Sequence, residues 1–168
     1  MKKYLAMSLS IGIVAGLWFF TASKLNLMPW PAYIGWSVFF WEGANFEAVK
    51  RGFPAIVLGA VLGFITFYCI GLLPDLNTVN LIFASLMVCL LAFTMAFAQN
   101  IKIFQVASAT FIGASHYFAL RGHAVYLDDP LMAFLTAAFV TSIGLILGVI
   151  SVWLGGVINK TVVKYEDY

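Results

Sequence analysis

The sequence predicts an all-α, polytopic membrane bundle of six transmembrane segments, a three-plus-three inverted repeat with broken second and fifth segments. The first observation is composition. Of the 168 residues, 63% are hydrophobic and 10% are charged, whereas soluble proteins are about 45–50% apolar and about 25% charged. The second is that several apolar stretches approach or exceed the roughly 17–25 residues that a helix needs to cross a bilayer. The third is a short motif that occurs twice.

The two copies of this motif lie half a chain apart. Residues 33–40 read YIGWSVFF and residues 111–118 read FIGASHYF, so both follow the pattern aromatic-Ile-Gly-x-Ser-x-aromatic-Phe. Gly113 follows Gly35 by 78 residues, close to half of 168. We interpret this spacing as duplication of a three-segment unit. The chain is then one membrane domain with repeat one at about 1–76, repeat two at about 77–158 and a polar tail at 159–168.

The first predicted helix spans residues 4–23 and carries Gly12 and Gly16, a spacing that permits close helix approach. Lys2 and Lys3 precede it as in a signal peptide. The apolar run is long for such a peptide and ends in bulky aromatic residues, so we expect it to remain as a membrane helix.

The second segment, about residues 27–41, is interrupted near its start by Pro29 and Pro31. About eleven residues of regular helix remain, too few for a comfortable crossing, so non-helical chain has to complete it. Such chain must be buried in protein or line a water-filled cavity. A polar connection is expected at 42–52, followed by a third helix at 53–73.

The second half repeats this order after a turn at residues 74–77. Segments are predicted at 79–98, 103–120 and 131–155, and the fifth is unusually polar for a membrane segment. Small residues recur at four-residue steps in the third and sixth segments, which predicts smooth helix-packing faces. They are Ala55, Gly59, Gly63, Gly144 and Gly148.

The distribution of Lys and Arg predicts the topology. With six crossings and a cytoplasmic N-terminus, seven of these residues fall inside and two, Lys24 and Arg121, fall outside. If the second and fifth segments did not cross, the split would be four against five, which shows no bias. The positive-inside rule therefore favours six crossings with both termini cytoplasmic, and three crossings per half make the repeats inverted.

Paired broken segments at corresponding positions of two halves are a sequence pointer to a binding site or pathway. Gly35 and Gly113 would let backbones approach, and Ser37 and Ser115 would present hydroxyl groups from equivalent positions. The alternative is a plain helix crossing, in which the glycines make contact and the serines bond to their own backbone. Thr110, just before the second motif, is a further candidate.

His116 is the histidine that falls within a predicted apolar segment, where ionisable residues count as functional candidates. It would bind a solute as a neutral donor and acceptor, or act as a proton-sensitive gate. Equally, it would be a packed histidine bonded to Gln99, Thr110 or a backbone carbonyl. Glu42 and Asn45, which follow the first motif, are weaker gate candidates and fit a solvated loop better.

The chain shows none of the sequence motifs of hydrolases, zinc proteases, redox dithiols or nucleotide-binding loops. Cys69 and Cys89 lie inside apolar spans without metal-like spacing and are interpreted as packing residues. The five tryptophans fit an aromatic belt at the membrane interfaces. We therefore expect no enzymatic activity, no cofactor, no metal and no nucleic-acid partner.

Around residues 33–40 and 110–118, and in its length and segment pattern, the chain resembles the YcdZ-like family of small bacterial inner-membrane proteins. Thr110-Phe111-Ile112-Gly113-Ala114 carries the resemblance most clearly. That family is a domain of unknown function and supplies no substrate. The resemblance implies a multi-pass protein of the bacterial inner membrane.

The leading functional hypothesis is a passive channel or facilitator for a small neutral or weakly polar solute. Repeat symmetry, broken segments and few charges motivate it, since selectivity in such a pore comes from diameter and a few hydrogen-bonding groups. The alternative is a membrane scaffold or accessory subunit without transport activity. A weaker alternative is a proton-coupled transporter using His116. The expected partners are the lipid bilayer and further copies of the chain, joined through glycine-rich helix faces.

Overall fold

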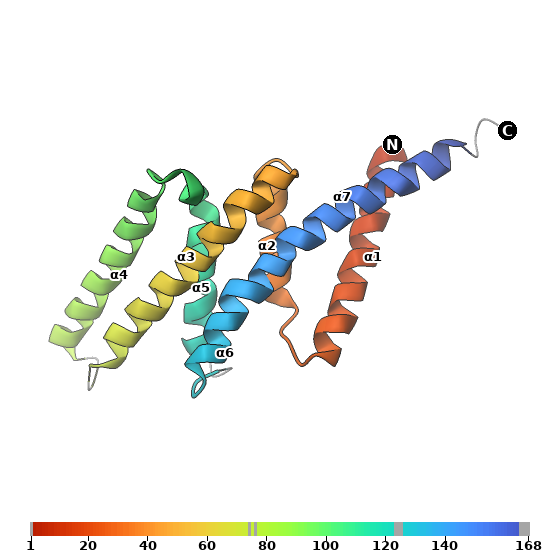
Figure 1. The fold of residues 1–168 in the computed structure, drawn as a ribbon. Coiled ribbons are helices and arrows are strands. Elements are labelled where there is room, and N and C mark those ends of the chain that lie inside the picture. Colours follow the sequence, from red (N-terminus) through yellow and green to blue (C-terminus); the bar gives the residue numbers. More distant parts are fainter. Residues whose placement is uncertain (1, 74, 76, 123–125, 165–168) are drawn as a thin grey trace.

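The computed structural model describes residues 2–73, 75, 77–122 and 126–164 (Figure 1), and the regular elements among them are helical, as predicted. Long helices alternate with short ones along the chain. In order, they are α1 (Lys2–Lys24), α2 (Trp30–Trp41), α3 (Phe46–Gly71), α4 (Thr78–Ala98), η1 (Lys102–Phe104), α5 (Ala107–Gly122), α6 (Pro130–Leu135), η2 (Thr136–Val140) and α7 (Thr141–Lys164).

Four helical stretches of the described chain are long and apolar enough to span a bilayer: α1, α3, α4 and the continuous rod formed by α6, η2 and α7. Helices α2 and α5 have 12 and 16 residues, which confirms that the second and fifth segments are short. All six rods nevertheless run between the same two ends of the bundle, in alternating direction (Figure 1).

Two predicted boundaries were wrong. Helix α3 begins at Phe46, so most of the polar connection expected at 42–52 is helical. The reason is a local cap: the Asn45 side chain accepts a hydrogen bond from the Ala48 amide at 3.1 Å. The helix continues through Pro54, as membrane helices often do. At the other end, α7 extends to Lys164, and the rest of the predicted tail, 165–168, lies outside the described residues.

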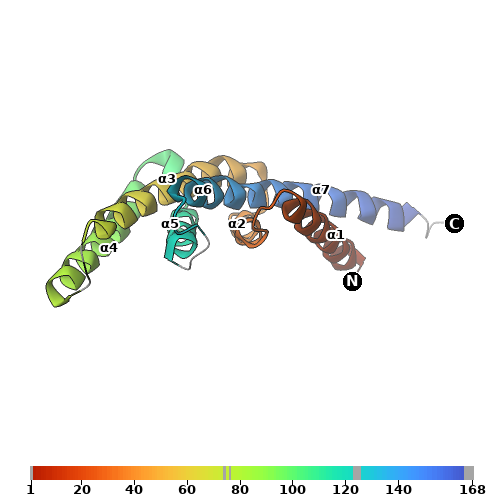
Figure 2. The same cartoon turned by 90° about the horizontal axis from the view of Figure 1, so that it is seen from below.

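Figure 2 shows that the bundle is a curved row of helices rather than a ring. Helices α3 and α7 form one layer in its centre, and α2 and α5 lie beneath them. Helices α4 and α1 form the two ends of the row. The most extensive contacts join α3 with α5 and α2 with α7, so the centre consists of two short helices, each packed on one long helix.

Glycines make both central contacts possible. A Cβ at Gly35 of α2 would overlap the Thr141 carbonyl of α7, and one at Gly144 would overlap the Ala32 carbonyl. In the other pair, a Cβ at Gly59 of α3 would overlap the Thr110 carbonyl of α5. The helices therefore cross with backbones in direct contact, which only residues without a side chain allow.

The second crossing is completed by Gly113, whose Cβ would overlap the Ile56 carbonyl. The contacts of the two crossings correspond one to one. Residues of α5 lie 78 positions after their counterparts in α2, and residues of α7 lie 85 positions after their counterparts in α3. The corresponding pairs are Ala32 with Thr110, Gly35 with Gly113, Ile56 with Thr141, and Gly59 with Gly144.

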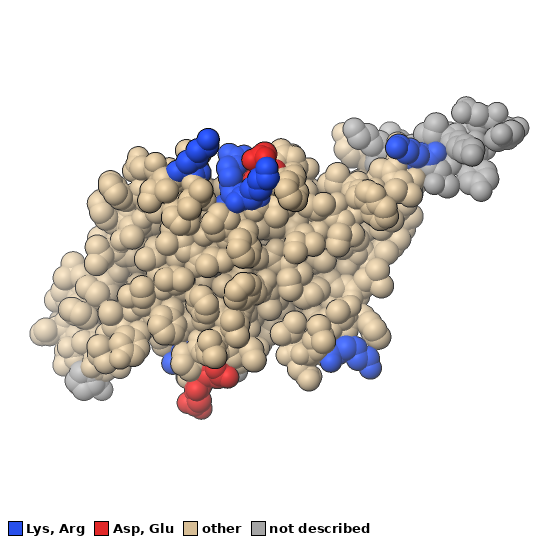
Figure 3. All heavy atoms as spheres, in the orientation of Figure 1, with Lys and Arg blue, Asp and Glu red and all other residues tan. Residues whose placement is uncertain are grey.

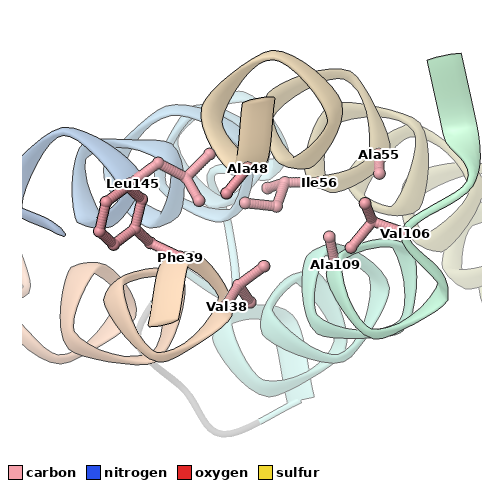
Figure 4. Packing of buried hydrophobic residues seen from close by; sticks show 8 residues of the cluster. All are labelled: Val38, Phe39, Ala48, Ala55, Ile56, Val106, Ala109 and Leu145. Atoms are coloured by element: carbon pink, nitrogen blue, oxygen red, sulfur yellow. The ribbon is translucent and has the colours of Figure 1, made fainter. Parts of the chain in front are cut away.

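A small apolar core lies where α2, α3, α5 and α7 meet (Figure 4). Its side chains point into one shared interior and are almost fully buried. They are Val38, Phe39, Ala48, Ala55, Ile56, Val106, Ala109 and Leu145.

Charged side chains are confined to the two ends of the bundle in the view of Figure 3, and the band between them is uncharged. Many large apolar side chains of this band are exposed, among them Leu17, Phe64, Leu86, Phe93 and Ile146. An exposed apolar belt between two charged ends is the surface that a lipid bilayer covers. Trp41 and Trp153 are exposed, as an aromatic belt requires, whereas Trp18 and Trp36 are buried inside the bundle.

Candidate functional site

The structure brings the two motifs side by side, because α2 and α5 are neighbours in the centre of the bundle. Their glycines do not face each other, however. Gly35 contacts α7 and Gly113 contacts α3, so both serve helix crossings, the packing role that the sequence left open for them. Any site between α2 and α5 must therefore be built from other residues of these helices.

The two motif serines lie in different grooves. Ser37 of α2 lines a groove of about 310 Å³ with Val38, Trp41, Ser108 and Ile112, so this groove lies between α2 and α5. The Ser37 hydroxyl also donates to the Ile34 carbonyl of its own helix at 2.6 Å.

Ser115, by contrast, faces α4. It lines an apolar groove of about 580 Å³ together with residues of α4 such as Leu91 and Met95. The expected pairing of the Ser37 and Ser115 hydroxyls in one place is thus not formed: the groove of Ser37 lies between α2 and α5, and that of Ser115 lies between α4 and α5.

His116 is buried, with 4% of its surface exposed. A hydrogen bond of 2.7 Å joins its Nδ1 to the Oγ1 of Thr141, which is fully buried. Trp30 packs edge-on against the imidazole with ring centroids 4.9 Å apart. The partners suggested by the sequence, Gln99, Thr110 or a carbonyl, are replaced by Thr141, which belongs to a distant part of the chain.

The remaining candidates have local roles. Thr110 is buried and donates to the Val106 carbonyl of the preceding turn at 3.1 Å, while its own carbonyl meets Gly59. Glu42 is the C-cap residue of α2, and Asn45 is the N-cap residue of α3. Both therefore lie at the turn between α2 and α3, and their role as a gate stays a prediction.

Further polar groups gather near the two short helices. Five buried side-chain polar atoms have no hydrogen-bond partner among the described residues: Trp36 Nε1, Arg51 Nε, Ser108 Oγ, Arg121 Nε and Thr136 Oγ1. Such atoms are few in native proteins, and they call for a specific explanation. Thr136 opens the π-helical turn η2 that ends just before Thr141, and π turns inside helices are frequent at functional sites.

Four residues near this site were not predicted from the sequence as site residues: Thr141, Thr136, Ser108 and Trp30. The signal for the threonines was present, because Thr136, Thr141 and Ser142 are polar residues within the apolar sixth segment. Their proximity to His116 was not readable, since Thr141 and His116 are separated by 25 positions and by a loop. Trp30 was assigned to the belt although its ring covers the histidine.

The described residues contain no group of three or more His, Cys, Asp or Glu side chains that could hold a metal ion. In the same part of the chain, no carboxylate lies within ion-pair distance of His116. The site is therefore an uncharged one, made of an imidazole, hydroxyl groups and indole rings in an apolar setting.

Comparison with known proteins places this architecture in a family. The family model described as "Protein of unknown function (DUF1097)" matches residues 8–156. The chain belongs to this family. It is also similar to "Inner membrane protein YcdZ" of Escherichia coli (strain K12), with 24% identity over 123 residues, which cover 73% of each chain.

The protein of the same name from Salmonella typhimurium (strain LT2) is likewise 24% identical over 123 residues, which cover 73% of this chain and 74% of the relative. No solved structure matches the chain. Together with the apolar helices, these relatives support a multi-pass integral protein of the inner membrane. The expected resemblance to the YcdZ-like family is confirmed.

Proposed function

We propose that this protein is a passive channel or facilitator for a small neutral or weakly polar solute, with its pathway between α2 and α5. The observation that carries the proposal is the buried His116–Thr141 pair on α5 and α7, because α5 also lines the α2/α5 groove through Ser108 and Ile112. Polar side chains at membrane depth are costly and usually face a pathway or a cavity. An enzymatic reaction, a cofactor and a metal are not part of the proposal.

The pathway has an open half and a closed half. Helix α5 carries Ser108 near its start and His116 eight residues later, a separation of about 12 Å along the helix axis. At the first level, Ser37 and Ser108 line the open groove of about 310 Å³. At the second, Trp30 and His116 fill the corresponding space with two rings packed edge to face. We place the constriction at His116, where the solute would exchange hydrogen bonds with the imidazole and with Thr141.

An inverted repeat supports such a pathway. We infer it from two features: the halves run in opposite directions (Figure 1), and the contacts of the two crossings correspond residue by residue. A pseudo-two-fold axis in the membrane plane would then pass between α2 and α5, where transporter folds of this kind place their sites. The charged end near η1 and the start of α3 would be cytoplasmic, together with both termini, in line with the positive-inside rule.

The site favours a neutral solute. His116 hydrogen-bonds to a hydroxyl group, and ion-coupled transport would need a carboxylate or a second titratable partner at this depth. No described carboxylate lies within ion-pair distance of the histidine. A proton-coupled mechanism is therefore the weaker alternative.

Homo-oligomerisation remains part of the proposal, but not through the glycines of the third and sixth segments. Gly59 and Gly144 are buried in crossings within one protomer. Gly12 and Gly16 of α1 are the pair left open, with nothing within 4 Å of a Cβ added at either position. An exposed small-xxx-small pair is the kind of surface on which membrane helices associate.

The decisive experiment compares two serine variants at matching motif positions. In proteoliposomes, stopped-flow light scattering measures the flux of water, glycerol, urea, ammonia, acetate and formate. We expect accelerated flux of one solute, reduced at least about tenfold by Ser37→Leu because leucine fills the α2/α5 groove. Ser115→Leu is the matched control, since this serine lines the α4/α5 groove instead.

Wild-type flux no faster than that of empty liposomes for every solute would contradict the channel. Equal effects of the two serine variants would contradict the proposed path. A scaffold function would be favoured instead if Gly16→Leu, on the open face of α1, abolished co-purification of a specific second protein while the fold remained intact.

A further inference from the structure

A second built site, separate from the α2/α5 groove in its lining residues, lies at the end of the bundle where α3 begins. Residues of the first two turns of α3 and of η1 line an open pocket of about 350 Å³. Figure 3 shows blue basic side chains gathered at this end, beside red acidic atoms. The lining residues are Glu47, Lys50, Arg51, Lys102, Ile103 and Gln105.

The charges of this pocket do not balance. The only carboxylate in its lining, Glu47, is paired with Lys50 at 2.8 Å. Arg51 and Lys102 form no ion pair among the described residues, although both interact electrostatically with Glu47 at longer range. Three cations thus share one carboxylate in the pocket lining, and the positive end of the α3 dipole adds to the excess of positive charge.

Arg51 carries the stronger indication. Its Nε atom is buried and has no hydrogen-bond partner within the described part of the chain. A buried donor of a charged group that stays unpaired is costly, and the planar guanidinium is suited to a bidentate contact with a phosphate. The arrangement suits the binding of an anion with several acceptor oxygens.

The apolar surroundings of the pocket favour the head group of a lipid over a free anion. Exposed apolar side chains flank it: Phe46, Phe53, Ile101 and Ile103 are 42–64% exposed. Lys50 also lies over the Phe46 ring, 5.4 Å from its centroid. Basic pockets between membrane helices at the cytoplasmic surface are typical sites for anionic head groups, with acyl chains on the adjacent apolar surface.

The basic residues of this pocket are not repeated at the corresponding positions of the opposite end of the bundle. The positions that correspond to Glu47, Lys50 and Arg51 are occupied by Met132, Leu135 and Thr136. Lys24 corresponds to Lys102, and it lies over the Phe20 ring, 5.7 Å from its centroid. Because the backbone contacts of the two helix crossings correspond without it, the basic cluster is not required for these crossings.

We propose that Arg51 and Lys102, at the junction of α3 and η1, bind the phosphate group of an anionic phospholipid of the surrounding leaflet. The Gln105 amide and the Lys50 ammonium group line the same pocket and would complete the contacts. This site is independent of the channel proposal.

The test uses the purified full-length protein in a neutral detergent, with thermal melting followed by tryptophan fluorescence. Dioleoylphosphatidylglycerol should raise the melting temperature with a saturating dose dependence, and dioleoylphosphatidylcholine should not. Each lost charge should weaken the apparent lipid affinity about fivefold, so Lys102→Gln gives about fivefold and Arg51→Gln/Lys102→Gln about 25-fold. Lys24→Gln, which removes a cation at the opposite end, is the matched control and should change nothing.

Lys102 is exposed on η1, so its variant keeps the fold and remains informative if the double variant does not fold. Native mass spectrometry of the same samples counts bound phosphatidylglycerol directly. Equal lipid affinity of wild type and Lys102→Gln, or equal stabilisation by phosphatidylcholine, would overturn the proposal. Stabilisation by inorganic phosphate at the same concentration and ionic strength would overturn the lipid as its source.

Discussion

The α2–α7 and α3–α5 crossings have the same backbone contacts and different side chains beside them. At one crossing, the carbonyl of Thr141 meets Gly35, and its hydroxyl bonds to His116. At the other, the carbonyl of Ile56 meets Gly113, and Ile56 lies in an apolar cluster with Val38. Val38 and Ile56 are the counterparts of His116 and Thr141, so one crossing is polar where the other is apolar.

This difference separates packing from function. The α3–α5 crossing forms with Val38 and Ile56 at the positions that correspond to His116 and Thr141. The geometry of such a crossing therefore does not require a histidine and a threonine. A buried polar pair that packing does not demand carries a cost in the membrane. The His116–Thr141 pair is therefore better explained by a functional role than by packing. The channel proposal rests on this pair.

The largest expected effect comes from filling either crossing. Gly59→Ala and Gly144→Ala should each lower the free energy of unfolding by about 3 kcal/mol or more, because the new Cβ overlaps a backbone carbonyl that cannot turn away. Thermal melting in detergent measures this. Gly12→Ala on the open face of α1 is the control and should have almost no effect. If only one of the two variants lowered the melting temperature strongly, the two crossings would not be energetically equivalent.

A smaller effect is expected at the polar pair. Thr141→Val keeps the shape of the side chain but leaves a buried imidazole nitrogen without its partner, which should cost about 1–3 kcal/mol of unfolding free energy. The double variant His116→Leu/Thr141→Val resembles the apolar crossing and should recover part of that stability while losing solute flux. Recovery of stability with unchanged flux would show that the pair is purely structural.

The smallest effect concerns the ends of the row. Helix α1 is tied to α7 by the Ser10 hydroxyl, which donates to the Ser151 carbonyl. The corresponding pair in α4 and α3, Val88 and Thr66, has no such bond among the described contacts. Ser10→Ala should cost about 0.6 kcal/mol, the average for hydrogen bonds between membrane helices.

The control for this change is Thr94→Ala, because Thr94 bonds only to the Leu90 carbonyl of its own helix. Hydrogen exchange in detergent micelles reports the local opening of α1 and α4. Equal protection of α4 and α1, although α4 makes fewer contacts with its neighbours, would remove the distinction between the two ends.

Much of the fold was predictable because it follows from local pattern. Apolar run length indicated the long helices, Pro29 and Pro31 indicated the short second one, and the repeated motif located both short helices. The start of α3 was misplaced because hydropathy was weighed above the Asn45 cap. The partner of His116 was not predictable, since a sequence pattern does not say which side chains of distant helices share one level.

The sequence by itself determined that this is an α-helical membrane protein with two short, matched helices and its charges at the helix ends. Only the tertiary structure decided that the motif glycines serve crossings within the protomer, that the motif serines diverge, and that Thr141 and Trp30 enclose His116. The physical reason is that membrane partition depends on the composition of each segment alone. Helix contacts depend on the rotation and depth of two segments together, which neither segment encodes separately.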